Sequence, residues 1–309
     1  MQTSIARSLS FLCITLVAGF SRAEEPLRWK FKSGETLHYE MMQNMESSAE
    51  AGPAGNIKTG MLQTLHMTWH IDEVTPEGDA KMRQKIDRVQ MKMTMPGGQV
   101  SEYDSAKDEA PQGVMAMIAP LFQAMTEGEF KLTMTSQGKI TDVEPPTDMV
   151  EAMKKIPGAA AMGNIASADG LKQMITQGSM ELPAGDLTKG ESWNTTMDMD
   201  SPAGKQIITT TYEYVGPRVE DGNQLEVFKP SIEIETAPGE NALVQMSMKD
   251  QSSEGEILFN REAGRLQSTH LQQKLNMEMK VQGQTINNII EQTVDMKFKP
   301  AESSDGKKE

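Results

Sequence analysis

The sequence lacks several features that would point to a thiol enzyme, a nucleic-acid-binding protein or a membrane-spanning protein. Cysteine occurs once, as Cys13 near the N-terminus, so the rest of the chain can form no disulfide, thiol nucleophile or thiolate metal site. The 30 Lys and Arg residues are outnumbered by 44 Asp and Glu, and the net charge of −14 disfavours nucleic acid as a partner. Beyond the N-terminal region, no stretch approaches the ~18 apolar residues of a transmembrane segment.

Residues 1–23 have the features of a secretory signal peptide. Arg7 supplies a positive charge, an apolar run follows from Ser8 to Phe20, and the small residues Ser21 and Ala23 lie at the −3 and −1 positions of a cleavage site. We therefore expect cleavage before Glu24 and a soluble protein that is secreted or periplasmic.

The sequence also lacks the common catalytic and cofactor motifs. It contains no G-x-S-x-G, no P-loop and no G-x-G-x-x-G. His66 and His70 are four residues apart, but on a strand of about 3.3 Å per residue they lie ~13 Å apart, too far for one metal ion. The sequence thus assigns no catalytic residue and no cofactor, and it favours a protein that is not an enzyme. A hydrolase with paired carboxylates stays open, because one sequence cannot show two acids on facing strands.

Alternation of apolar and polar residues predicts strands through most of the chain. Between Met61 and Ile71 most apolar side chains occupy odd positions, while Thr and His occupy even ones. A change of phase in the strand that begins near Met82 predicts a β-bulge near Asp87. Helical spacing predicts helices at 112–125, 148–156 and 169–177, and further strands are expected at 129–134, 139–143, 193–199, 207–215, 225–235, 243–248, 256–259, 265–281 and 284–298. The predicted fold is mainly β (α+β), with large curved antiparallel sheets and a few short helices in the middle of the chain.

Two segments of the chain begin alike, which raises the alternative of a degenerate internal duplication. Gly34-Glu35 and Gly190-Glu191 each precede a strand that contains methionine. On this basis we expect a first β-rich unit with a helical insert at residues 24–180, a second β-rich unit at 181–300 and a disordered tail at 301–309. The other explanation is that any antiparallel sheet reuses glycine turns.

Short motifs spread over most of the chain resemble a family of uncharacterised secreted bacterial proteins of the planctomycete type. They are Arg28-Trp29-Lys30-Phe31 with Gly34-Glu35, Tyr103-Asp104-Ser105, Leu182-Pro183 with Gly190-Glu191-Ser192-Trp193, and Gly255-Glu256-Ile257 with Gly264-Arg265. The resemblance implies export and a β-rich domain but no reaction. The expected architecture is also similar to that of periplasmic lipoprotein carriers, a likeness of fold alone.

Methionine is the most unusual feature of the composition, at 26 of 309 residues. Many occur as M-x-M, which on a strand places both side chains on one face. Three interpretations are open: a core in which methionine replaces leucine and isoleucine, a plastic cavity for an apolar or lipid-like ligand, and a copper or other soft-metal site. The predicted cavity residues are Trp69, Met91, Met93, Leu275, Met277 and Met279, and the predicted metal ligands are Met91, Met93, Met277 and Met279.

The leading hypothesis from the sequence is an exported, soluble binding protein. Its partner is expected to be an apolar small molecule, a lipid or another envelope protein. Soft-metal binding and a purely structural or interaction role are the alternatives.

Overall fold

The computed structural model describes residues 25–50, 55–107, 111–156, 167–177, 179–201, 204–238, 244–281 and 284–300. The predicted signal peptide and the predicted C-terminal tail lie outside these ranges, so both stay predictions.

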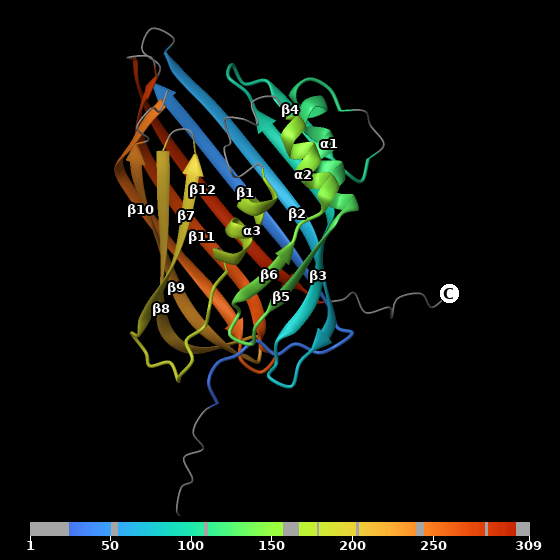
Figure 1. The fold of residues 1–309 in the computed structure, drawn as a ribbon. Helices are drawn as coiled ribbons and strands as arrows, with labels where there is room; N and C mark the ends of the chain where they lie inside the picture. Colours follow the sequence, from blue (N-terminus) through green and yellow to red (C-terminus); the bar gives the residue numbers. More distant parts are fainter. Residues whose placement is uncertain are drawn as a thin grey trace, which may run out of the picture.

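Twelve strands form one curved, open antiparallel sheet, which confirms the predicted fold class (Figure 1). The order across the sheet is β6-β5-β3-β2-β1-β12-β11-β10-β9-β8-β7, and the short strand β4 pairs with β3. The strands are β1 (Thr36–Glu50), β2 (Asn56–Val74), β3 (Ala80–Thr94), β4 (Val100–Asp104), β5 (Glu129–Met134), β6 (Ile140–Glu144), β7 (Ser192–Ser201), β8 (Gly204–Glu220), β9 (Asn223–Pro238), β10 (Val244–Asn260), β11 (Arg265–Val281) and β12 (Gln284–Lys299).

The strands follow the alternation of the sequence closely. β5 and β11 have the predicted bounds, and the register between β2 and β3 shifts where Asp87 is the extra residue, so the predicted bulge is confirmed. The segments predicted at 243–248 and 256–259 are instead parts of the single strand β10. The polar run between them resembles a loop in sequence, but it keeps its backbone paired with β11.

The chain lays down the sheet in two halves that meet in the middle. It moves outward from β1 to the edge strand β6, crosses to the opposite edge at β7, and returns strand by strand to β12, which pairs with β1. The two halves therefore build one continuous sheet, and the division at residue 180 stays a prediction.

The two Gly-Glu turns that open the halves make the same hydrogen bonds. In Gly34-Glu35, the Gly N–H donates to the carbonyl of Ile71 (2.8 Å) and the Glu carbonyl accepts from the N–H of Ile71 (2.9 Å). In Gly190-Glu191, the corresponding groups bond to Tyr214 at the same two distances. We propose on this basis that the halves arose by duplication.

Three helices lie on the concave side of the sheet: α1 (Val114–Glu127), α2 (Thr147–Lys155) and α3 (Ala168–Gln177). α3 contacts both edge strands, β6 and β7. Gln173 Nε2 donates to the carbonyl of Asp198 on β7 (2.8 Å), and Gln177 Oε1 accepts from the N–H of Asp198 (3.1 Å). The amides of α3 thus bind the exposed edge of β7. No helix in the described part of the chain is long and apolar enough to cross a membrane.

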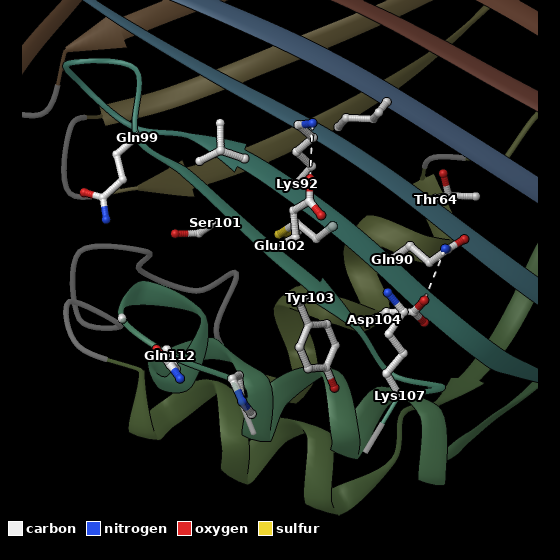
Figure 2. A pocket seen from close by; sticks show the side chains of 15 residues that line it. Thr64, Gln90, Lys92, Gln99, Ser101, Glu102, Tyr103, Asp104, Lys107 and Gln112 are labelled. Carbon is white, nitrogen blue, oxygen red and sulfur yellow. Dashed lines mark hydrogen bonds and ion pairs between the residues drawn. The ribbon is translucent and has the colours of Figure 1, made fainter. Parts of the chain in front are cut away.

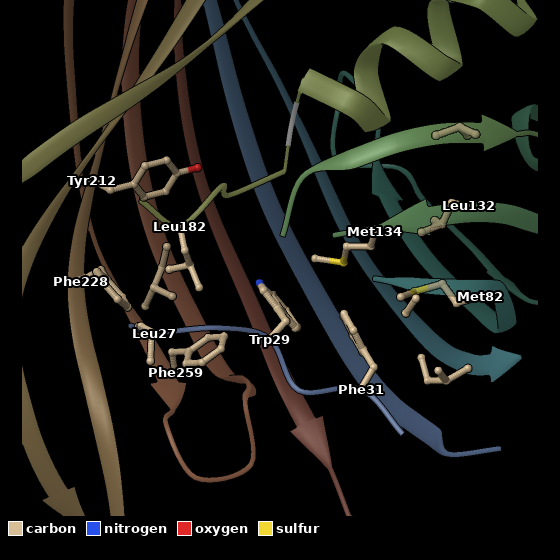
Figure 3. Packing of buried hydrophobic residues seen from close by; sticks show 14 of the residues in the cluster. Leu27, Trp29, Phe31, Met82, Leu132, Met134, Leu182, Tyr212, Phe228 and Phe259 are labelled. Atoms are coloured by element: carbon tan, nitrogen blue, oxygen red, sulfur yellow. The ribbon is translucent and has the colours of Figure 1, made fainter. Parts of the chain in front are cut away.

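The lower end of the sheet, as drawn in Figure 1, encloses a packed core around the N-terminal segment (residues 25–33). Trp29 stacks on Phe31 and meets Phe259 edge-on, with ring centroids 5.7 and 5.3 Å apart. The backbone N–H of Trp29 donates to Ser136, and that of Lys30 donates to Gly264 on the opposite side of the interior. Figure 3 shows this lower cluster, which includes Leu27, Met82, Leu132, Met134, Leu182, Tyr212 and Phe228. The N-terminal segment therefore ties the two halves of the sheet together.

Candidate functional site

Besides the uncharged polar side chains of Gln206, Thr236 and Asn288, the upper half of the concave face in strands β7–β12 is lined by methionine, isoleucine and leucine. Strand alternation and register place these side chains on one face, beside one another across the sheet. We call them the methionine face: Met197, Met199, Ile208, Ile232, Ile234, Met246, Met248, Leu275, Met277, Met279, Ile286 and Ile290. Most are half-buried, while Leu275 and Met277 are buried.

The methionine face contains no charge, although 24% of the chain is charged. Among the described residues, the upper concave positions of β7–β12 hold no Asp, Glu, Lys, Arg or His. The charges of the same strands lie on the convex face, where Lys274 pairs with Glu291 (2.6 Å) and His270 with Asp295 (2.8 Å). This segregation produces an apolar interior, in which an isolated charge would be costly.

The structure divides the six predicted cavity residues into three groups. Trp69 lies in the lower half, where its ring packs against Tyr39 with centroids 4.7 Å apart. Met91 and Met93 lie on β3 and pack with α1. Leu275, Met277 and Met279 lie together on β11 and belong to the methionine face. Four strand spacings of about 4.8 Å separate β3 from β11, ~19 Å along the sheet, so a single cavity lined by all six stays a prediction.

Methionines that the sequence could not pair lie opposite the predicted ones. Met246 is opposite Met279 and Met248 is opposite Met277 in the β10–β11 register. The predicted set of four metal ligands is therefore split between β3 and β11, while β10 and β11 place four methionines in two opposed pairs. Groups of three or more His, Cys, Asp or Glu that could hold a metal are absent from the described residues.

A cavity of about 930 Å³ lies between the β3–β4 hairpin and the start of α1 (Figure 2). Of the six predicted residues, Met91 lines it. The other lining side chains are mostly polar, and Lys92 pairs there with Glu102 (3.2 Å). Asp104 accepts two hydrogen bonds from Arg88 (2.8 and 2.6 Å), which lower the pKa of the carboxyl to about 2. This cavity is thus a charged, internally paired surface and is poorly suited to an apolar chain. The sequence gives no signal for this cavity, because β4 is short and mostly polar.

Strands β9 and β10 separate above their lower ends, and side chains bridge the gap, including Thr236, whose hydroxyl donates to the carbonyl of Met246 (3.4 Å). Backbone pairing between them covers only the last four residues of β10. Above that, Pro230 has no N–H to donate. Gln251 then accepts from the N–H of Ile234 (2.8 Å) and donates to its carbonyl (3.1 Å). Ser253 does the same for Ile232 (2.6 and 3.1 Å). We call this region the β9–β10 seam; its side chains take the place of backbone ladder bonds.

A family model matches residues 77–264, which is more than half of the chain. The chain belongs to DUF6263, a family of unknown function. The match confirms one part of the prediction from the sequence motifs, namely that the chain belongs to a family without an assigned reaction. No curated protein matches the chain.

Solved structures show only a distant likeness to this DUF6263 protein. Lipovitellin, from a structure of its lipid–protein interactions, is 14% identical with a TM-score of 0.46, over 89% of this chain and 26% of that one. A protein with a YmcC-like fold from Bacteroides fragilis is 10% identical with a TM-score of 0.27, over 89% and 100%. DynF from Micromonospora chersina is 5% identical with a TM-score of 0.21, over 89% and 86%. The chain thus spans about a quarter of lipovitellin, and at these TM-scores the likeness carries no argument about function.

Proposed function

We propose that this DUF6263 protein binds the hydrocarbon chain of an amphiphile against the methionine face. The observation that carries the proposal is an uncharged inner face on a sheet of twelve strands. In closed barrels, eight strands enclose an interior that side chains fill or that holds one small ligand, and more strands enclose more space.

Several of the described segments occupy parts of the interior, among them α3, which contacts the edge strands β6 and β7. The N-terminal segment fills the lower end, and α1 packs on the concave side of β1–β3 through Met115 and Phe122. The packed clusters of the described residues do not include the methionine face. An apolar surface of this kind in a soluble protein marks a binding site. Flexible thioether side chains can adapt to chains of different length and shape.

Export is part of the same proposal. The signal-like segment at residues 1–23 supports a periplasmic or extracellular location, where amphiphiles need a carrier to cross water. An envelope protein as the partner of the methionine face is the alternative occupant, and the experiment below separates the two.

The experiment combines native mass spectrometry of residues 24–309 with titration of the neutral probe N-phenyl-1-naphthylamine. We expect retained mass of a few hundred daltons or saturable probe binding. Met279→Glu places a charge on the methionine face and should weaken probe binding tenfold or more. Met42→Glu is the matched control, because Met42 is 42% exposed on the convex face.

Equal probe affinity for the two variants would contradict the proposal. A bare polypeptide mass together with no probe binding would also contradict it. A second protein that stays bound to the chain in the mass spectrum would instead indicate an envelope partner.

Soft-metal binding is a second candidate because Met246, Met248, Met277 and Met279 form two opposed pairs on β10 and β11. Thioethers suit copper(I) in an exported protein. Competition with a copper(I) chelator tests this candidate: binding should be lost in the double variant Met277→Leu, Met279→Leu. Copper(I) affinity that is unchanged in that variant would exclude these methionines as ligands.

A further inference from the structure

A polar row crosses the concave face where the lower cluster gives way to the methionine face. In the register of β12, β11 and β10, Gln292 lies opposite Gln273, and Gln273 lies opposite Ser253. Gln273 is buried between Leu271 and Leu275 of its own strand face, and only 6% of it is exposed. The row therefore places amide groups at the border of an uncharged surface whose own polar side chains include the buried Asn288, opposite Met277.

Gln273 has a free hydrogen-bond donor in this row. Its Oε1 accepts from Gln292 Nε2 (2.7 Å), but its own Nε2 is buried and has no hydrogen-bond partner in the described structure. A buried amide donor without an acceptor is unfavourable, so such groups are rare in native proteins. Trp29 and Trp193 also bury an indole N–H without a partner, but both lie in the lower cluster.

The surroundings of Gln273 restrict the acceptor to an uncharged group. The row consists of neutral side chains, and the described concave positions above it hold no Lys, Arg or His. A carboxylate or phosphate buried there would have no cation to compensate it. A neutral carbonyl can accept a hydrogen bond from the unpaired side-chain amide of Gln273 without a cation nearby.

We propose that the ligand is a neutral amphiphile with an ester or amide carbonyl, and that this carbonyl accepts a hydrogen bond from Gln273 Nε2. The inference rests on the proposed function, because the hydrocarbon chain of this ligand lies on the methionine face. Gln273 is the residue that distinguishes an acyl ester or amide from a plain hydrocarbon and from a free fatty acid.

The test compares three ligands of similar length in displacement of N-phenyl-1-naphthylamine: methyl laurate, laurate and tridecane. One hydrogen bond predicts that methyl laurate binds about threefold to tenfold more tightly than tridecane, and laurate at pH 8 should bind more weakly than its ester. Gln273→Leu should remove the preference for the ester and leave tridecane affinity unchanged. Gln272→Leu is the control, because Gln272 is the exposed neighbour on the convex face.

A second readout does not depend on affinity. In infrared spectra, the C=O stretching band of ¹³C-labelled methyl laurate should move to lower frequency when the ester binds to the wild-type protein. With Gln273→Leu or Gln273→Met, the band of the bound ester should return toward the frequency it has in a hydrocarbon solvent. Two variants are used so that misfolding of one does not decide the result.

The outcomes separate this inference from the proposed function. If all three ligands bind and Gln273→Leu changes no ratio between them, Gln273 does not recognise a carbonyl, while the methionine face remains the chain-binding surface. Tighter binding of laurate than of its ester would overturn the neutral-acceptor inference in the same way. If neither the probe nor any of the three ligands binds, the proposed function and the inference both fall.

Discussion

Gln251→Leu tests whether side chains hold the β9–β10 seam together. Leucine has a similar length but can neither accept from the N–H of Ile234 nor donate to its carbonyl, so the variant removes both bonds of Gln251. The neighbouring bonds from Ser253 to Ile232 remain. The perturbation is therefore confined to one rung of the seam.

The expected magnitude follows from the two groups left without partners. A typical intramolecular hydrogen bond contributes about 0.5–1.5 kcal/mol, and a buried group left unpaired costs more. Ile234 is half-buried, so water can partly replace the lost partners. We expect Gln251→Leu to lower the free energy of unfolding by about 2 kcal/mol, and the double variant with Ser253→Ala by about 3–4 kcal/mol, because the two rungs are adjacent.

The assay is equilibrium denaturation in guanidinium chloride, with amide hydrogen exchange measured in β9. Exchange should accelerate at Ile234 in Gln251→Leu, while amides at the lower end of β9, which pair directly with β10, keep their protection unless the whole protein unfolds. Gln272→Leu, on the convex face, should change neither quantity. Unchanged exchange at Ile234 with a loss of less than about 0.5 kcal/mol would refute the view that these side chains replace the backbone ladder.

Three further predictions concern other parts of the fold. Asp104→Asn should reduce stability at neutral pH, because Arg88 holds the pKa of Asp104 at about 2. The stabilisation is present above the unfolded pKa near 3.9 and is lost as pH falls toward 2, so denaturation curves of the two proteins should converge in that range; a constant difference would contradict this. Trp29→Ala should lower the free energy of unfolding by about 3–5 kcal/mol, since Trp29 is only 6% exposed; a loss below 1 kcal/mol would show that the N-terminal segment is not part of the core. Gly138→Ala should be clearly more destabilising than Gly97→Ala in thermal unfolding. Both glycines have φ near +90°, but a Cβ at Gly138 would lie 2.6 Å from Trp29 Nε1, while the space around Gly97 is open; equal effects would argue against this close packing.

Most of the sheet could be predicted from the sequence because its signal is local. Alternation is visible within a strand, and a phase change such as that at Asp87 marks a bulge without knowledge of the neighbours. The bounds predicted for the three helices lie within two residues of the observed ones at every end. β10 was divided in two because its central residues are polar on both faces, and only its pairing with β11 shows that they continue the strand.

The site could be predicted only in part, because it depends on register. Alternation alone indicates that Met277 and Met279 share a face, but it cannot show that Met248 and Met246 lie opposite them. Pairing of distant strands likewise decides that Met91 and Met93 lie under α1, away from β11. The unpaired side-chain amide of Gln273 cannot be recognised in the sequence, since a glutamine on a strand has no signature until its neighbours are known.

The junction between β1 and β12 has a consequence for the order in which the sheet can assemble. The other neighbouring strands pair over much shorter separations, the longest being that of Ala80 on β3 with Met134 on β5, whereas Ser47 on β1 hydrogen-bonds Asn288 on β12 across 241 residues. The cost of closing so long a loop delays this pairing until the last strand is available. Until then the first half has a bare inner edge at β1, and unpaired strand edges promote aggregation. A fragment that ends at residue 180 should therefore self-associate, and the release of a complete chain should limit how fast this protein reaches its native form.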